Sequence, residues 1–172
     1  MLNPLLKGKI IQCHIDKWDP DSFVVGRLWY SDDTWLVMQN ISPSGRWNGV
    51  ALYQMVDLVR VTVQSEYLKR TKKLIRLRKE SAPQVVAISG CALTAVLRDA
   101  MQQSTFLSFE LWQSGGRDVS GIVEDVTDQV VRVRQIDEYG VADGYSFISM
   151  EAISRCYVDD EEAKCLQMLV NG

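Results

Sequence analysis

The sequence predicts a mainly β protein built from two tandem five-stranded barrels, each flanked by α-helices. Shifting the chain by 95 positions aligns residues 24–75 with residues 119–170 without a gap and gives 12 identities in 52 positions, where chance gives about three. Each copy contains five short apolar or alternating runs bounded by turn residues. Each copy then ends in an amphipathic helical pattern. Because self-similarity at a fixed period marks duplicated architecture, the repeat sets the fold class.

The identities define two domains, residues 1–80 and residues 81–172. Units of about 80 residues bury only about 60 % of their unfolded surface, so we expect them to pack together or to assemble with other chains. The residues that recur 95 positions later are Val24, Gly26, Asp33, Ile41, Gly45, Gly49, Met55, Arg60, Val63, Glu66, Lys69 and Leu74.

Charge separates the two copies, although the whole chain carries only −3. Residues 1–80 contain 13 Lys and Arg against 8 Asp and Glu, a net +5, and residues 81–172 contain 6 against 14, a net −8. This asymmetry predicts an anionic partner for the first copy, or attraction between basic and acidic halves.

Neither export nor membrane insertion is expected. Residues 1–9 contain two lysines without a following apolar run, and the weakly polar run over 85–97 is shorter than the roughly 20 residues that a membrane span needs. The four cysteines lack metal or redox spacing, which predicts reduced, buried thiols in a cytoplasmic protein.

The strands of the first copy are expected at 9–17, 23–30, 35–41, 50–53 and 58–63. In the first, Ile11 and Cys13 alternate with Gln12 and His14, which predicts a half-buried strand. In the second, Gly26 marks a bend or bulge. Comparison of the copies places Val24, Gly26 and Leu28, and then Leu36 and Met38, on the inner face, with Val37 and Gln39 on the outer face.

The strands of the second copy are expected at 106–112, 118–125, 130–136, 145–148 and 153–158. The first lies one position off the 95-residue shift, which predicts an insertion or deletion just after it. Helices are expected as a short turn over 1–7 and as longer segments over 65–80, 93–102 and 160–170.

This pattern resembles the Sm-like fold, to which the bacterial Sm-like RNA chaperone belongs. A leading helix and a glycine in the second of five strands carry the resemblance, together with an apolar pattern at residues 23–28, 35–38 and 52–61 and again at 119–123, 130–133 and 147–156. Other SH3-like barrels give similar strings. The resemblance implies small barrels and, in the RNA-binding members, a ring that binds RNA.

The residues that such RNA binders use are absent. Asp33 is followed by Thr34, Trp35, Leu36 and Val37, without the asparagine of the Asp-x-x-x-Asn loop. The later strand has Tyr53-Gln54-Met55 where the chaperone carries lysine and histidine. The resemblance therefore implies the fold rather than the ligand.

No catalytic constellation is present, and we predict no enzyme, no cofactor and no metal. The only histidine, His14, lacks a converging partner in sequence, so a structural or solvated role is predicted. Cys91 has no second histidine to activate it and is predicted to be a buried thiol. The acidic run over 159–162 lacks EF-hand spacing and is expected to begin a helix in solvent.

Most candidate binding residues are present in only one copy; Lys69, which recurs as Lys164, is the exception. Aromatic and arginine side chains of the first copy are replaced in the second by Ile122, Glu124, Val130, Val141 and Ala142. Aromatics interleaved with arginines make stacking surfaces for bases or anchors for proteins, although they can equally pack between domains or under a helix. With the basic face of the helix over 65–80, the predicted set is Arg27, Trp29, Trp35, Arg46, Trp47, Lys69, Lys72 and Lys73.

Two functions follow from these residues. The first is a non-catalytic interaction or regulatory module whose first copy binds a protein partner or another copy of the chain. The alternative is an RNA-binding protein that uses the aromatic and basic residues of the first copy.

Overall fold

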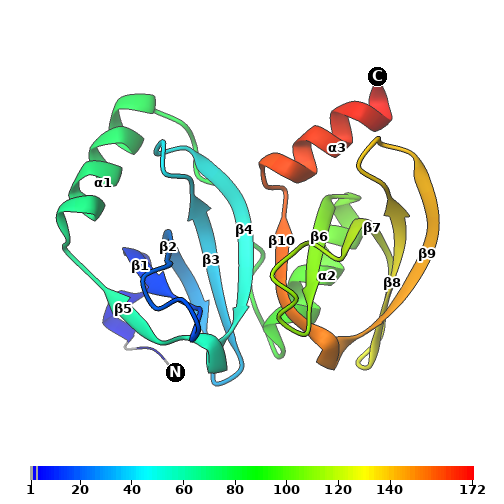
Figure 1. Cartoon of the computed structure of the whole chain (residues 1–172), viewed down its shortest axis with the longest axis horizontal. Coiled ribbons are helices and arrows are strands. Elements are labelled where there is room, and N and C mark those ends of the chain that lie inside the picture. Colours follow the sequence, from blue (N-terminus) through cyan, green and yellow to red (C-terminus); the bar gives the residue numbers. More distant parts are fainter. Residues whose placement is uncertain (1, 3) are drawn as a thin grey trace. The chain divides into compact units, whose positions relative to one another are not determined.

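The computed structural model describes residue 2 and residues 4–172 and is mainly β, with antiparallel strands and three α-helices in this part of the chain (Figure 1). The contacts divide it into two compact units, residues 1–85 (unit 1) and 86–172 (unit 2). The boundary expected after residue 80 lies five residues before the one that the contacts give.

Unit 1 is a five-stranded antiparallel sheet followed by one α-helix. Its strands follow the order β5-β1-β2-β3-β4. A 3-10 turn at Pro4–Leu6 precedes them, and residues 1 and 3 of the expected N-terminal turn lie outside the described residues. The elements are β1 (Ile10–His14), β2 (Val24–Ser31), β3 (Trp35–Ile41), β4 (Trp47–Gln54), the 3-10 turn η2 (Met55–Asp57), β5 (Arg60–Thr62) and α1 (Glu66–Arg78).

Unit 2 repeats this plan after a leading helix. Its strands follow the order β10-β6-β7-β8-β9. The elements are α2 (Ala92–Gln103), β6 (Phe106–Leu111), β7 (Val119–Val126), β8 (Val130–Ile136), β9 (Ala142–Ser149), the 3-10 turn η3 (Met150–Ala152), β10 (Ile153–Val158) and α3 (Glu161–Asn171).

Strand register confirms that the two units share one plan. Leu28 pairs with Met38 in unit 1, and their equivalents Val123 and Val133 pair in unit 2. A register shift follows in each unit, between Leu28 and Tyr30 and at the equivalent place. The first strands, β1 and β6, are offset by 96 positions, as the sequence predicted.

In neither unit do the described hydrogen bonds join the first and last strands of the sheet, so the structure does not show closed barrels. The outer strands of unit 2, β9 and β10, do not pair with each other in the described pairings, and nor do β4 and β5 of unit 1. Only the three residues of η3 connect β9 to β10, a reach of at most about 14 Å. A flat five-stranded sheet would hold its edges about 19 Å apart. The sheet of unit 2 must therefore curl strongly.

Two of the repeated glycines allow the helix that ends each unit to lie against the loop before the fourth strand. A Cβ on Gly45 would meet the Cβ of Leu74 on α1, and a Cβ on Gly140 would lie 2.6 Å from the Cβ of Leu169 on α3. Both glycines also have positive φ, near +76° and +79°, which side chains disfavour. Gly45 and Leu74 therefore recur together as Gly140 and Leu169, because the leucine side chain occupies the space that a Cβ on the glycine would need.

Burial in β3 differs from the predicted alternation. Leu36 and Met38 are buried as expected, but Val37 and Gln39 on the face predicted to be outer are buried as well. The Gln39 side chain donates a 2.5 Å hydrogen bond to the carbonyl of Pro83, so the segment after α1 covers part of this face. In unit 2 the equivalent strand does alternate, with Val131 and Val133 buried and Arg132 and Arg134 partly exposed.

The first two strands of unit 1 also bury more than predicted. In β1, Gln12 and His14 are buried together with Ile11 and Cys13, so the strand is not half-buried. In β2, Val25 is buried and Val24 is only partly buried. Val25 packs with Ile41 and with Leu68 of α1, because the helix covers this face of the sheet.

The cysteines are all free, but only two are buried. Cys13 and Cys156 lie in the core, whereas Cys91 and Cys165 are exposed, so the predicted burial of all four thiols is wrong. Cys91 stands at the N-cap of α2, where its backbone begins the helix. No helix among the described residues is long and apolar enough to cross a membrane.

Burial of Cys13 makes stability fall in alkaline solution. Desolvation of the thiolate raises the pKa of Cys13 from 9.0 to about 12. The unfolded chain therefore loses this proton first, and stability that is present below pH 9 is lost as the pH rises towards 12, by up to about 1.4 kcal/mol per pH unit. Urea unfolding of the parent and of Cys13→Val at several pH values measures the difference. If the free energy of unfolding depends on pH equally in the parent and in Cys13→Val between pH 9 and 12, the prediction is contradicted.

Candidate binding surface

Helix α1 is fixed at both ends by local chemistry. Ser65 is its N-cap and accepts a hydrogen bond from the Leu68 amide at 3.2 Å. The same hydroxyl donates to the Gln12 side chain at 3.4 Å, which ties the helix start to β1. Lys79 ends the helix in the left-handed conformation, with φ near 57°. These contacts hold α1 across one end of the unit 1 sheet (Figure 1).

The underside of α1 is apolar. Leu68 is fully buried against Val25 and Ile41, and partly buried residues surround this cluster. These are Ile10, Trp47, Tyr67 and Ile75. Burying a leucine is worth roughly 1.5–3 kcal/mol, so this contact anchors the helix.

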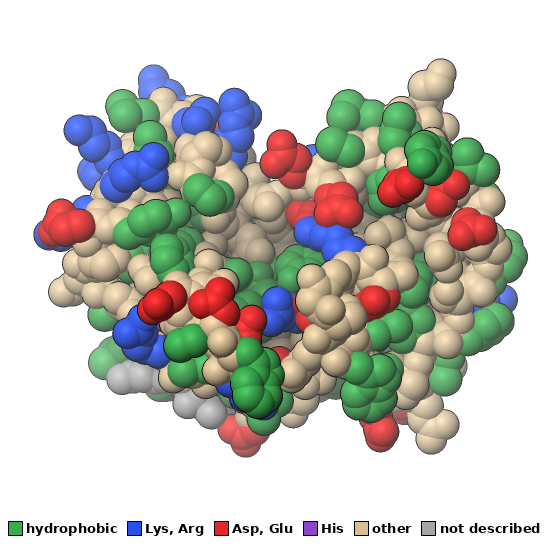
Figure 2. Space-filling view, viewed as in Figure 1, with side chains coloured by type: hydrophobic (Ala, Val, Ile, Leu, Met, Phe, Trp, Pro, Cys, Tyr) green, Lys and Arg blue, Asp and Glu red, His purple; other side chains and the backbone are tan. Residues whose placement is uncertain are grey.

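The opposite side of α1, with the neighbouring loop, is strongly basic, and Lys and Arg side chains gather over it (Figure 2). Of the 13 residues of α1, six are Lys or Arg and one is acidic. We call this region the basic helix surface and define it as Arg46, Lys69, Arg70, Lys72, Lys73, Arg76, Arg78 and Lys79.

Backbone carbonyls position two of these cations. Arg70 donates to the Pro43 carbonyl at 3.1 Å, and Arg78 donates to the Ser44 carbonyl at 3.0 Å, so both arginines lie along the loop between β3 and β4. A carbonyl orients a guanidinium without neutralising it, so these arginines keep their charge for a ligand.

Two cations of the surface form ion pairs. Lys69 meets Glu66 at 2.5 Å and Arg46 meets Glu80 at 3.3 Å. Both pairs are largely exposed and contribute little to stability. Lys72 is half-buried and Lys73 is exposed, and both lie on the same stretch of the helix.

The predicted aromatic residues do not form an open stacking platform. Trp35 is only 4 % exposed, so it belongs to the core rather than to a surface. Trp47 is half-buried and packs against the cluster beneath α1. The Arg27 guanidinium lies 4.7 Å from the centre of the Trp47 ring, a cation–π contact. Trp29 is half-buried on β2.

The structure thus brings together one part of the predicted set. Arg46, Lys69, Lys72 and Lys73 share the basic helix surface, and the stacked pair of Arg27 and Trp47 lies beside the underside of α1. Sequence reasoning missed Arg78, which the structure adds to this surface. The available signal was its position four residues after Leu74, the residue that contacts the loop at Gly45.

Unit 2 lacks most of this charge, although Lys69 recurs as Lys164. Arg70, Lys72, Lys73 and Arg76 correspond to Cys165, Gln167, Met168 and Asn171, and Arg46 corresponds to Val141. The same helix and loop therefore form without the cations. Since the shared plan does not need them, the charge of unit 1 is available for binding.

His14 holds unit 1 together rather than acting as a free base. The Pro20 carbonyl can only accept, so Nδ1 of His14 donates to it at 2.7 Å. In the neutral ring Nε2 then accepts from Arg60 and from the Gln12 amide, each at 3.1 Å. His14 is 2 % exposed. These bonds join β1, β5 and the loop after β1.

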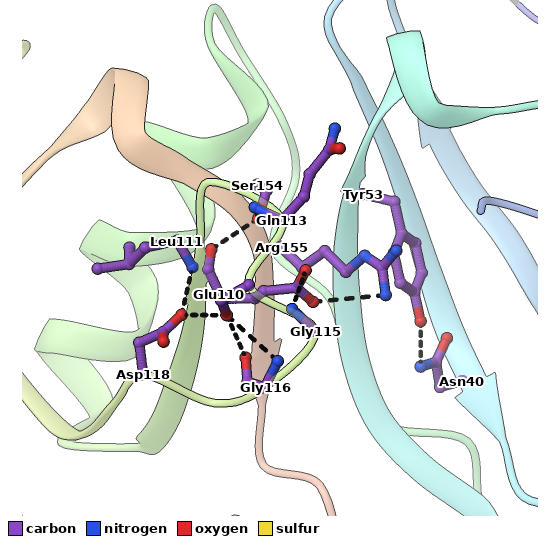
Figure 3. A network of polar contacts seen from close by, with 11 residues as sticks. Asn40, Tyr53, Glu110, Leu111, Gln113, Gly115, Gly116, Asp118, Ser154 and Arg155 are labelled. Carbon is purple, nitrogen blue, oxygen red and sulfur yellow. Dashed lines mark hydrogen bonds and ion pairs between the residues drawn. The ribbon is translucent and has the colours of Figure 1, made fainter. Parts of the chain in front are cut away.

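Unit 2 has an ion pair at the same place (Figure 3). Glu110 on β6 stands where His14 stands on β1, and its carboxylate meets Arg155, the repeat of Arg60, at 3.4 Å. Glu110 also accepts from the Gly115 amide at 3.3 Å. The recurrence of Arg60 as Arg155 was the sequence signal for this contact, and a structural role explains it.

Among residue 2 and residues 4–172, no group of three or more His, Cys, Asp or Glu side chains is placed to hold a metal ion. The acidic run after β10 begins α3, where Asp160 caps the helix by accepting from the Ala163 amide at 3.0 Å. Asp160 also meets Arg117 at 2.5 Å. Asp160 is 3 % exposed, so it starts the helix as predicted but is buried in unit 2 rather than in solvent.

Comparison with protein-family models, with curated proteins and with solved structures finds no match to this chain.

Proposed function

We propose that the protein is a non-catalytic interaction module whose basic helix surface binds an acidic surface of a partner protein. The observation that carries this proposal is the difference between the two copies: they share one plan, but five cations on the helix and loop of unit 1 are uncharged residues in unit 2, where Lys69 alone of the compared positions recurs, as Lys164. Clustered cations with few neighbouring carboxylates attract and orient an anionic partner.

The alternative partner is RNA. Binding of single strands without sequence preference combines a basic groove with exposed aromatic rings on which bases stack. Burial of Trp35 and packing of Trp47 beneath α1 remove two of the three predicted rings from such a role. An acidic protein needs only the cations, and therefore fits this surface better.

The fold that carries the surface is proposed to be a duplicated Sm-like or SH3-like barrel. The strand order, the 3-10 turn before the last strand and the strong curl support it. A reducing compartment such as the cytoplasm suits a chain with four free cysteines. Self-association remains a second mode of partner binding, because net charges of +5 and −8 on the two units attract each other between copies.

The test compares two polyanions and two matched double variants. Labelled poly-L-glutamate and a single-stranded RNA are titrated at about 50 and about 200 mM salt. We expect poly-L-glutamate to bind Lys72→Ala, Lys73→Ala about tenfold more weakly than the parent, because two cations leave the surface. Lys7→Ala, Lys9→Ala removes the same charge from exposed positions outside the surface and should change binding less than about twofold.

Equal weakening in both double variants would contradict the surface, because net charge alone would then explain binding. If the chain binds RNA more tightly than poly-L-glutamate, and Trp29→Ala abolishes RNA binding, then RNA rather than an acidic protein is the partner. Binding of either polyanion through these cations should weaken as salt rises, because salt screens the attraction between charges.

A further inference from the structure

Strand β9 of unit 2 exposes two aromatic side chains on an edge. Within unit 2, β9 pairs with β8 and ends the strand order. Tyr145 is 59 % exposed and Phe147 is 70 % exposed, and their spacing of two puts them on one face of the strand. Ile148, which points to the other face, is buried. An eight-residue edge with exposed aromatics is a template for another strand.

Unit 1 has no aromatic side chains at the corresponding places. The residues of β4 that correspond to Tyr145 and Phe147 are the aliphatic Val50 and Leu52. Large exposed apolar side chains on a soluble unit mark interaction sites when they lie together. The aromatics of β9 are therefore a feature of unit 2 alone.

Two carboxylates stand at the ends of this strand. Asp143 lies near its start and Glu151 lies just after its end, and both are exposed. Their counterparts in unit 1 are the uncharged Asn48 and Val56. On the neighbouring strand, Arg132 and Arg134 share Glu124 at 3.5 and 3.2 Å, and the Arg132 guanidinium also lies 5.9 Å from the centre of the Tyr145 ring. Each end of β9 carries an exposed carboxylate, in a unit of net charge −8.

We propose that β9 docks an extended segment of a partner protein, with an apolar centre and Lys or Arg at both ends. The segment adds as a strand to β9, its apolar side chains cover Tyr145 and Phe147, and its basic ends meet Asp143 and Glu151. Six residue steps separate Asp143 from Ser149 at the end of β9, about 20 Å in a strand, and Glu151 follows in η3. This length fits a segment of about seven to nine residues.

This site is separate in charge and chemistry from the basic helix surface. One unit takes an anionic partner and the other takes a basic, extended one, so a single chain can hold two different proteins. The edge of β5 in unit 1 is a poor counterpart for β9, because β5 has only three residues and its arginine contacts His14. A separate protein segment is therefore the better occupant than a second copy.

The test uses a labelled peptide of about nine residues, with lysines at both ends and alternating valines and threonines between them. Fluorescence polarisation is measured with the whole chain. We expect Tyr145→Thr, Phe147→Thr to bind at least about tenfold more weakly, because buried aromatics dominate such interfaces. Asp143→Asn, Glu151→Gln should weaken binding by about threefold to tenfold and flatten its salt dependence.

Three controls make the result specific. Trp18→Thr removes an aromatic ring that is 87 % exposed in unit 1 and should leave binding within about twofold. Lys72→Ala, Lys73→Ala should also leave peptide binding unchanged, which separates this site from the proposed function. All variants are substitutions of exposed or half-buried side chains, so thermal unfolding should stay within a few degrees of the parent.

Several outcomes would overturn the proposal. One is equal affinity of the parent and Tyr145→Thr, Phe147→Thr for the peptide. Another is equal binding of a peptide whose lysines are replaced by glutamates. A third is sedimentation of the parent as a dimer that becomes a monomer in Tyr145→Thr, Phe147→Thr, since a second copy would then occupy β9.

Discussion

Gly121→Ala is expected to lower the free energy of unfolding by about 3 kcal/mol, at the upper end of the cost of overpacking. A Cβ at this position would collide with the carbonyl oxygen of Arg134 and lie 3.0 Å from its carbonyl carbon. Backbone on a neighbouring strand cannot turn aside as a side chain can. The strand would have to separate from β8, with loss of ladder hydrogen bonds.

The duplicated position makes this a test of the shared plan. Gly26→Ala should show a similar loss, because its Cβ would lie 2.7 Å from the carbonyl oxygen of Gln39. Gly116→Ala, with nothing within 4 Å, should change stability by less than about 0.5 kcal/mol. Urea unfolding followed by tryptophan fluorescence measures all three. Losses as large for Gly116→Ala as for Gly121→Ala would contradict the steric account.

Leu68→Ala is expected to destabilise unit 1 by about 3 kcal/mol, because it opens a cavity beneath α1. Leu68 is 0 % exposed and packs against Val25 and Ile41. Loosening this contact also displaces the helix that carries the basic helix surface. Binding of poly-L-glutamate should therefore weaken in the same variant, although no cation is removed.

Unit 2 suggests how to repair the cavity. Its helix α3 has Ala163 and Leu166 where α1 has Leu68 and Thr71, so the large and small residues are exchanged. Leu68→Ala, Thr71→Leu should recover about 1–2 kcal/mol of the loss. Thr71→Leu alone should be destabilising, since Thr71 is buried and the larger side chain would overpack. Purely additive losses in the double variant would contradict this equivalence.

The duplication could be predicted from the sequence because it rests on spacing. The strands at 35–41, 130–136 and 153–158 begin and end where the pattern placed them. The sequence also signalled the deeper burial of β3, since its run from Trp35 to Met38 is continuously apolar, as is typical of strands covered on both faces. Strict alternation in the second copy obscured that difference.

Closure of the sheet and the roles of the tryptophans could not be predicted. Five short strands fit a closed barrel and a curled open sheet equally, because closure depends on one pairing between distant strands. Because unit 2 tolerates Val130 and Ala142 in their places, the sequence left open whether Trp35 and Trp47 bind a partner or pack between domains or under the helix. Burial of the first and packing of the second beneath α1 depend on the sizes of neighbouring side chains, which spacing does not encode.

The basic helix surface was the predictable part of the site. Its cations follow helical periodicity, and their loss from the second copy was visible in the alignment of the repeats. The bonds of His14 were not predictable, because they join three segments far apart in the chain. The exposure of Cys91 was not predicted either. Cys91 directly precedes an apolar helix, and its position in the sequence does not show that its own side chain faces solvent.

The most direct measurement is a map of backbone amide shifts by two-dimensional NMR as poly-L-glutamate is added to the whole chain. The proposed function predicts shifts in the loop over 42–48 and in α1, with the equivalent loop over 137–143 and α3 unaffected. Shifts of the same size in both units, or shifts confined to unit 2, would show that the cations of α1 are not the binding surface.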